Sequence, residues 1–160
     1  MWKDKFNDIL SLFGHRNWIV VADKAYPQQI GQGVITIDSN EELDRVLDYV
    51  LSKIQEAPHV KPLVYTDLEL KYMDDTIMPG SEQMRHKIYQ IINQHVDGEL
   101  KCLHHNKELF PKFDAVSKQF SILVIKTNCT IPYTSVFMEL DCGYWNNEKE
   151  HLLRAKMGEQ

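Results

Sequence analysis

The sequence predicts a single α/β domain in which helices flank a largely parallel β-sheet. Segments with helical periodicity alternate with short apolar runs, which is the order expected when helices connect the strands of a sheet. Several of these runs are continuously apolar, as in strands that are covered on both faces. The chain has 160 residues, 43% of them hydrophobic, with no internal repeat or linker. One compact core is therefore expected.

The first predicted elements are a helix and a buried strand. Apolar side chains recur at the i, i+3, i+4 and i+7 positions of one helical face: Phe6, Ile9, Leu10 and Phe13. Gly14 follows as the expected helix C-cap, because glycine tolerates the left-handed conformation. The continuous run 18–22 predicts a strand, and residues 34–37 predict a second, shorter one.

The strongest helical pattern follows a predicted capping box, Ser39 with Glu42 three residues later. Its apolar stripe consists of Leu43, Val46, Leu47, Val50, Leu51 and Ile54. Pro58 closes this helix, and residues 62–65 predict a short strand. Residues 66–80 are expected to form a polar loop that can hold one helical turn.

The second half of the chain continues the alternation. Ser81 is the expected cap of a helix whose stripe consists of Met84, Ile88, Ile91, Ile92 and His95. Pro111 is compatible with a short helix over 110–116 only in its first turn. Strands are expected at 99–103, 121–125 and 136–140. The domain is therefore predicted over residues 1–145, followed by a charged, exposed tail over 146–160, either helical or frayed.

Composition and charge exclude several classes of function. The formal net charge of −5 disfavours a nucleic-acid partner, which normally requires a basic face. No apolar stretch approaches the roughly 20 residues needed to cross a membrane, and the N-terminus lacks the pattern of a secretory signal. The three cysteines have no paired spacing and are expected as free thiols. These features predict a cytoplasmic protein.

Three polar segments occur where predicted strands begin or end, which is where parallel sheets bind ligands. They are His15 with Asp23, then His104 with His105, and finally residues 130–135. No phosphate-binding glycine loop, nucleophile motif or metal-ligand spacing accompanies them. Spacing alone therefore indicates a polar site at strand ends and little more.

Each segment also has an ordinary structural explanation. Asp23 can be a turn residue, and His15 would lie at the opposite end of an extended strand from it. The two adjacent histidines lack the further ligands of a zinc site and fit a solvated loop equally well. The hydroxyls of residues 130–135 could hold a polyhydroxylated ligand or simply precede the last strand.

Two longer segments are more specific. FNDILSLFGHRNWIVVADKAYP resembles the N-terminal signature of the D-ribose pyranase and L-fucose mutarotase family, and SILVIKTNCTIPYTSVFMELDCGYW resembles its second hallmark. Between them, GVITIDSNEELDRVLDYVL matches the helix that follows the family's second strand. The order of elements agrees over about residues 4–145.

The resemblance implies cofactor-independent interconversion of the anomers or ring forms of a free monosaccharide. One group removes the proton of the anomeric hydroxyl and another protonates the ring oxygen, so neither a nucleophile nor a metal is required. The resemblance implies that His15 is the proton donor, that Asp23 binds sugar and that Tyr133 joins the catalytic set. The resemblance implies one further sugar contact from either His105 or His104, and Ser135 and Thr134 are expected to contact the sugar as well.

The family also forms rings of subunits, often decamers, with each pocket at a subunit boundary. The resemblance therefore implies a homo-oligomer in which a neighbouring chain completes the site. This sequence departs from the family pattern at Lys24-Ala25, where the family has a small residue and glycine, and at Ser135, where it has asparagine. The alternatives are an oligomer that binds sugar without converting it, and a domain that binds only proteins.

Overall fold

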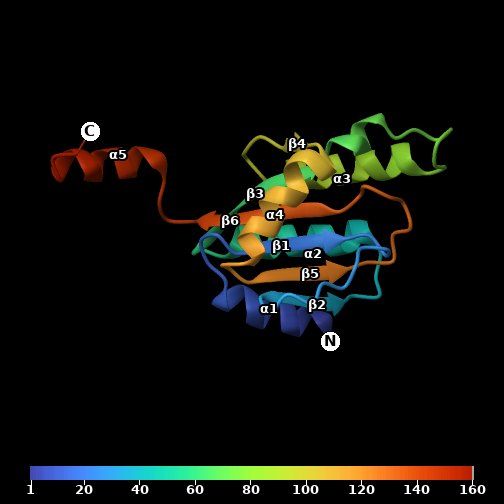
Figure 1. Cartoon of the computed structure of the whole chain (residues 1–160), viewed down its shortest axis with the longest axis horizontal. Coiled ribbons are helices and arrows are strands. Elements are labelled where there is room, and N and C mark those ends of the chain that lie inside the picture. The colour runs from blue at the N-terminus through green and yellow to red at the C-terminus, as the bar shows by residue number, and fades with distance from the viewer. Residues whose placement is uncertain (160) are drawn as a thin grey trace.

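The computed structural model describes residues 1–159 and confirms an α/β domain built on one six-stranded sheet (Figure 1). The strands are β1 (Trp18–Ala22), β2 (Val34–Asp38), β3 (Val60–Asp67), β4 (Lys101–Leu103), β5 (Ile122–Lys126) and β6 (Val136–Cys142). The α-helices are α1 (Trp2–Leu12), α2 (Leu43–Glu56), α3 (Ser81–His95), α4 (Phe110–Ser117) and α5 (Asn147–Lys156). A 3₁₀ turn spans Leu68–Tyr72, and a π-helical turn spans His105–Leu109.

The sheet has the strand order β2-β5-β1-β6-β3-β4. β5 pairs in parallel with β1 and β2, and β3 pairs in parallel with β4, whereas β6 runs antiparallel to both β1 and β3. The expectation of a largely parallel sheet is therefore confirmed, with one reversed strand. As a consequence, the start of β6 lies at the same edge as the ends of β1, β3 and β4.

Helices cover both faces of the sheet, as the continuous apolar strands predict. Every residue of β1 is buried. Ile19 and Val21 face a core shared with α1, α2 and α3, while Trp18, Val20 and Ala22 face a second core shared with α4. Figure 1 shows α4 in front of the sheet and α2 behind it. All six apolar positions of the α2 stripe are buried, which confirms that helix.

The predicted helix caps are wrong at three positions. α1 ends at Leu12, and the left-handed residue of the turn that follows is Arg16, with φ 78°, whereas Gly14 has no positive φ. The side chain of Asn17 accepts a hydrogen bond from the Gly14 N–H. Ser39 does not cap α2, because its hydroxyl donates to the Lys126 carbonyl at 2.6 Å and ties the loop to β5.

Ser81 is likewise inside its helix rather than before it. Gly80, with φ 91°, is the N-cap of α3. The side chain of Asp75 accepts hydrogen bonds from the N–H groups of Gly80 and Glu82. The Asp75 carboxylate, five residues before Gly80, therefore caps the helix in place of Ser81. The spacing of residues next to the helix does not reveal this contact.

Strand boundaries also differ from the prediction, among them those of β3 and β4. The strand expected at 99–103 is shorter and begins at Lys101, while the strand expected at 62–65 extends over β3 to Asp67. The longer β3 moves Asp67 from the predicted polar loop to the edge of the sheet. Pro111 lies in the first turn of α4, as expected.

Beyond β6 the chain forms the helix α5, which projects away from the sheet (Figure 1). Within residues 1–159, no helix combines the length and the apolar character that a membrane crossing requires.

Candidate functional site

Polar side chains from four strand ends meet at one edge of the sheet. Asp23 follows β1, Asp67 ends β3, His105 comes just after β4, and Ser135 precedes the reversed strand β6. Together with Tyr133 they line a cavity of about 220 Å³. The cavity combines these polar groups with an apolar wall contributed by Ala25, Tyr26, Pro27, Phe110 and Pro132.

Asp23 is held by the residue that precedes β6. The Ser135 hydroxyl donates to Oδ1 of Asp23 at 2.7 Å, and the same hydroxyl accepts a hydrogen bond from the Asp23 backbone N–H at 3.1 Å. This reciprocal pair fixes the carboxylate against the sheet. A second hollow of about 260 Å³ shares Asp23, Ala25 and Pro132 with the first. Asp23 therefore borders open space on more than one side.

The buried Asp67 and the half-buried His105 form a hydrogen-bonded pair that lines the same cavity as Asp23. Asp67 is only 2% exposed, and its Oδ1 lies 2.7 Å from Nδ1 of His105. Burial raises the pKa of the Asp67 carboxyl, although the hydrogen bond from His105 opposes this shift. The same hydrogen bond raises the pKa of His105 against the effect of burial. Both directions favour a proton that stays within the pair.

The Asp67 bond also sets the orientation of the imidazole. Because Nδ1 of His105 faces the carboxylate, Nε2 is the ring nitrogen left to act elsewhere. Glu69 supports the arrangement from the 3₁₀ turn, since its carboxylate accepts the backbone N–H of His105 at 3.0 Å. The imidazole is therefore held in place by two acidic residues from the end of β3 and the turn after it.

Tyr133 reaches the cavity from a strained turn. Its φ is 63°, in the left-handed region that bulky residues rarely adopt. Its ring meets the His105 ring edge to face, with centroids 6.0 Å apart. The side chain is 37% exposed, so it stands at the rim rather than in the core. Strain of this kind concentrates at functional sites.

Tyr26 contributes a buried hydroxyl to the same cavity. Burial raises its pKa far above the ordinary value, and the negative charges of Asp67 and Asp23 raise it further. Its phenol therefore stays protonated throughout the physiological range. The cavity thus contains two carboxylates, an imidazole and two phenols within a partly apolar wall.

His15 does not share this cavity within one chain. Its Nδ1 lies 3.1 Å from Asp141, near the end of β6, whereas Asp23 is bonded to Ser135, just before the start of β6. Six residues of extended strand between Ser135 and Asp141 correspond to about 20 Å. The imidazole is largely exposed at the opposite edge of the sheet. The two halves of the GHRNWIVVAD segment are separated as strand geometry predicts.

The remaining predicted positions lie around the cavity but do not line it. The His104 side chain accepts the Lys107 backbone N–H at the start of the π-helical turn. Thr134 is fully buried and donates to the Ile131 carbonyl at 2.7 Å. Of the adjacent histidines, His105 is the one at the cavity. The Lys24 ammonium pairs with Asp38 at 3.4 Å.

Sequence reasoning missed Asp67 and Tyr26. Asp67 satisfies the criterion that selected Asp23, an acidic residue at the end of an apolar strand. Asp67 was not identified as a candidate because the strand was predicted to end at Tyr65, two residues earlier. Tyr26 lies three residues after Asp23, in the segment GHRNWIVVADKAYP, and carried no separate chemical signal.

No protein-family model and no curated protein matches this sequence. Three solved structures are similar in fold. RbsD from Bacillus subtilis complexed with D-ribose has 20% identity and a TM-score of 0.56, covering 86% of this chain and 91% of that one. The fucose mutarotase of Streptococcus pneumoniae in complex with L-fucose has 18% identity and a TM-score of 0.57, with coverage of 84% and 89%. FucU from Bifidobacterium longum has 13% identity and a TM-score of 0.54, with coverage of 86% and 94%.

These likenesses extend over most of each chain. At this level of identity they show that the chain shares its fold with RbsD, FucU and the fucose mutarotase, as the sequence motifs indicate. Two of the three structures contain a bound monosaccharide.

Proposed function

We propose that this protein interconverts the anomers or ring forms of a free monosaccharide by general acid–base catalysis, without a cofactor. The observation that carries the proposal is the cavity at the sheet edge, where Asp23, His105 and Tyr133 meet around a small space. Its volume of about 220 Å³ is below the roughly 300–1,000 Å³ typical of sites for drug-sized ligands. A single sugar ring suits such a site better than a nucleotide does.

The proposed reaction moves two protons. A base removes the proton of the anomeric hydroxyl while an acid protonates the ring oxygen, and the C1–O5 bond of an aldopyranose breaks to give the aldehyde. Rotation of the aldehyde, or attack by another hydroxyl, closes the ring in a new form. Positioned acids and bases typically contribute about 10²–10⁴-fold, which suffices for a reaction that already proceeds in water.

The contacts of each residue suggest which step of the proposed reaction it serves. The hydrogen bond to Asp67 raises the pKa of His105 and turns its Nε2 away from that carboxylate. Nε2 can therefore accept a sugar hydroxyl, or protonate a sugar oxygen when the ring is imidazolium. Asp23 keeps Oδ2 free of the Ser135 bond and can accept a sugar hydroxyl. The phenol of Tyr133 donates at the rim of the cavity.

In the proposed assembly, His15 acts at the cavity of a neighbouring chain. By resemblance it is the proton donor, yet within one chain about 20 Å of strand separates it from the cavity. A ring of subunits that places the His15 edge of one copy against the cavity edge of the next would join them. This oligomer, and the cytoplasmic setting predicted with it, belong to the proposal.

Exchange NMR of D-ribose, L-fucose, galactose and glucose tests the proposal. Wild-type protein should accelerate anomer exchange of at least one sugar above the buffer rate, and His15→Ala should abolish the acceleration. Buffer rates for all four sugars with folded protein would refute catalysis.

A second candidate is binding without turnover. It is favoured by the Ser135–Asp23 bond, because a hydroxyl of the protein already occupies one oxygen of the key carboxylate. Calorimetry separates the two candidates. Saturable sugar binding at buffer exchange rates would select the binding protein, whereas binding with acceleration selects the enzyme.

A further inference from the structure

The helix α5 stands apart from the domain. It spans Asn147–Lys156 and has no buried residue, and Figure 1 shows it projecting beyond the end of β6. The Asn146 side chain caps it by accepting the Lys149 N–H at 2.8 Å. Isolated helices shorter than about 12–15 residues are marginal in water. A helix of this length is therefore expected to gain stability by packing against a partner.

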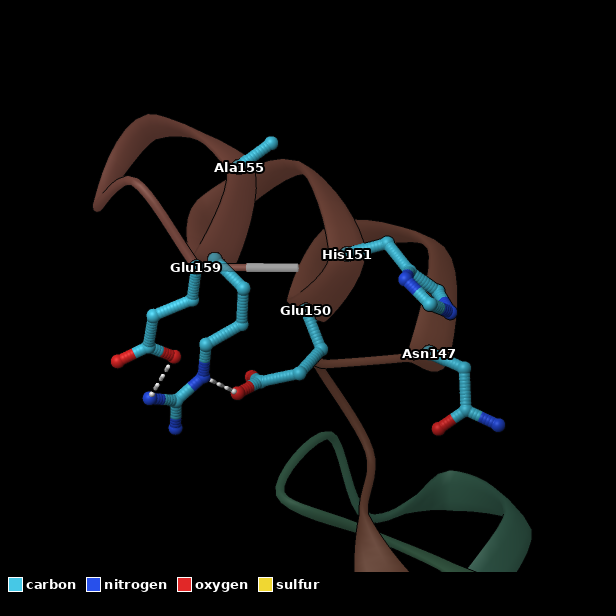
Figure 2. A pocket seen from close by; sticks show the side chains of 6 residues that line it. Asn147, Glu150, His151, Ala155 and Glu159 are labelled. Atoms are coloured by element: carbon cyan, nitrogen blue, oxygen red, sulfur yellow. Dashed lines mark hydrogen bonds and ion pairs between the residues drawn. The ribbon is translucent and has the colours of Figure 1, made fainter.

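The two faces of α5 differ in chemistry. One face is polar: the Arg154 guanidinium donates to Glu150 at 2.8 Å and to Glu159 at 3.0 Å. Figure 2 shows Glu150 and Glu159 pointing to the same side of the helix. Helical periodicity places a different set of side chains on the other face. They are the exposed apolar residues Leu152, Leu153 and Met157 together with Lys149 and Lys156, and we call them the apolar-basic face.

A groove lined by apolar and charged residues lies close to Gly143, four residues before the start of α5. A cavity of about 480 Å³ opens between the C-terminal ends of α2 and α3 and the beginning of β3, and we call it the terminal groove. Its apolar surface includes Pro62, Val96 and Leu63, of which Leu63 is 39% exposed. Asp97 and Lys61 both line it, and the Lys61 ammonium is already bonded to the Trp145 carbonyl. Glu56, the last residue of α2, pairs with Lys53 at 3.4 Å. The C-terminal ends of α2 and α3, together with the Asp97 carboxylate, favour a lysine side chain there.

The chain between β6 and α5 directs the helix away from its own groove. Gly143 lines the terminal groove, and a Cβ atom there would meet the Pro58 carbonyl oxygen and the Val60 nitrogen at 2.8 Å. Lys61 donates to the Trp145 carbonyl at 3.1 Å and holds the next residues against β3. Folding back would require the chain to reverse within residues 143–146.

We propose that the apolar-basic face of α5 docks in the terminal groove of a second copy of this chain. Each copy carries both helix and groove at the same end of the sheet, so two copies related by a twofold axis can exchange their helices and close the assembly. An anionic membrane is a poorer partner, because the face carries only Lys149 and Lys156 and the whole chain has a net charge of −5. The proposal does not depend on sugar conversion.

Unlabelled and ¹⁵N-labelled full-length protein are dissociated, mixed in equal amounts and reassembled, and carbodiimide cross-linking then tests the exchange. Links from Lys149 or Lys156 to Asp97 or Glu56 are expected, about half of them joining a labelled to an unlabelled peptide. Links only between peptides of the same label would mean that each helix occupies its own groove. No such link, or α5 bound instead to anionic vesicles, would also overturn the proposal.

Sedimentation velocity gives an independent measure. The Leu152→Ser/Leu153→Ser variant should form particles of about half the wild-type mass, because each helix links two copies. Ala155 lies outside the apolar-basic face, so Ala155→Ser is the matched control and should leave the mass unchanged. Lys156→Glu should weaken the assembly, and Asp97→Lys in that background should restore it. Unchanged mass in the double serine variant would contradict the exchange.

Discussion

The Asp67–His105 pair determines how the site responds to pH. Burial raises the pKa of Asp67, and the hydrogen bond to Asp67 raises the pKa of His105. Groups with raised pKa values in the folded state bind protons more tightly than in the unfolded chain. Their stabilising contribution is complete below the unfolded values, which for histidine is about 6.5, and is lost as the pH rises through the folded ones.

We therefore expect His105→Gln to flatten the pH dependence of stability. As the pH rises above the unfolded histidine value of about 6.5, the free energy of unfolding of the wild-type protein should fall more steeply than that of the variant. Denaturant unfolding at a series of pH values measures the difference. Asp67→Asn should flatten the profile in the same way, and Ala155→Ser should leave it unchanged. Parallel profiles for wild type and His105→Gln would contradict the pairing.

Tyr133 illustrates a conflict between stability and function. A left-handed backbone at a bulky residue costs roughly 1–3 kcal/mol, and glycine removes that cost. We expect Tyr133→Gly to be at least as stable as wild type in thermal unfolding, even though the ring contact with His105 is lost. Sugar exchange should be lost with the phenol. A clearly destabilised but active variant would show that the residue serves packing alone.

At the scale of elements, the close contact between Gly143, just after β6, and the start of β3 leads to a specific prediction. A Cβ atom at Gly143 would lie 2.8 Å from backbone atoms of Pro58 and Val60, whereas nothing lies within 4 Å of the corresponding position at Gly14. Gly143→Ala should lower the free energy of unfolding by about 1–3 kcal/mol, as overpacking does. Gly14→Ala should change it little. Equal effects in denaturant titrations would contradict the close approach.

The periodicity of apolar residues predicted the helices and strands correctly, whereas the predicted helix caps were wrong. The α2 stripe and the β1 run could be predicted because burial of a continuous apolar pattern leaves few alternatives. The roles of Ser39 and Ser81 could not, because their environments depend on distant partners. Ser39 bonds to Lys126, 87 residues away, and Asp75 takes over the capping of α3.

The same distinction applies to the candidate site. Asp23, His105 and Tyr133 could be found from strand ends and motif resemblance, because their chemistry is visible in the residue type. Asp67 could be identified only if β3 was predicted two residues longer, and strand boundaries are the part of a sequence prediction that is most often wrong. The contact between Ser135 and Asp23 spans 112 positions and arises only when β6 reverses beside β1.

For the whole molecule, the reversed strand β6 explains why the candidate site residues of one chain lie at two opposite edges of the sheet. Its start brings Ser135 to the cavity, and its end carries Asp141 to His15 at the opposite edge. The proposed ring joins the edges of neighbouring copies. The α5 exchange uses the same end of the sheet as His15 but a different surface, the terminal groove.

Subunit mixing tests whether the site is shared. His15→Ala and His105→Ala should each be inactive alone, since each lacks one of the two imidazoles. After the two variants are dissociated, mixed and reassembled, about a quarter of the sites should combine an intact His15 with an intact His105 from its neighbour. Exchange activity should recover to that extent. Absence of recovery in fully mixed assemblies would place the site within one chain.

Catalysed ring opening is tested by two-dimensional exchange NMR on D-ribose and L-fucose with the wild-type protein. Exchange cross-peaks between the anomers should grow faster than in buffer for at least one of the sugars. The acceleration should disappear in Asp23→Ala and persist in Ala155→Ser. Wild-type protein that binds either sugar yet leaves its exchange at the buffer rate would contradict catalysis at this cavity.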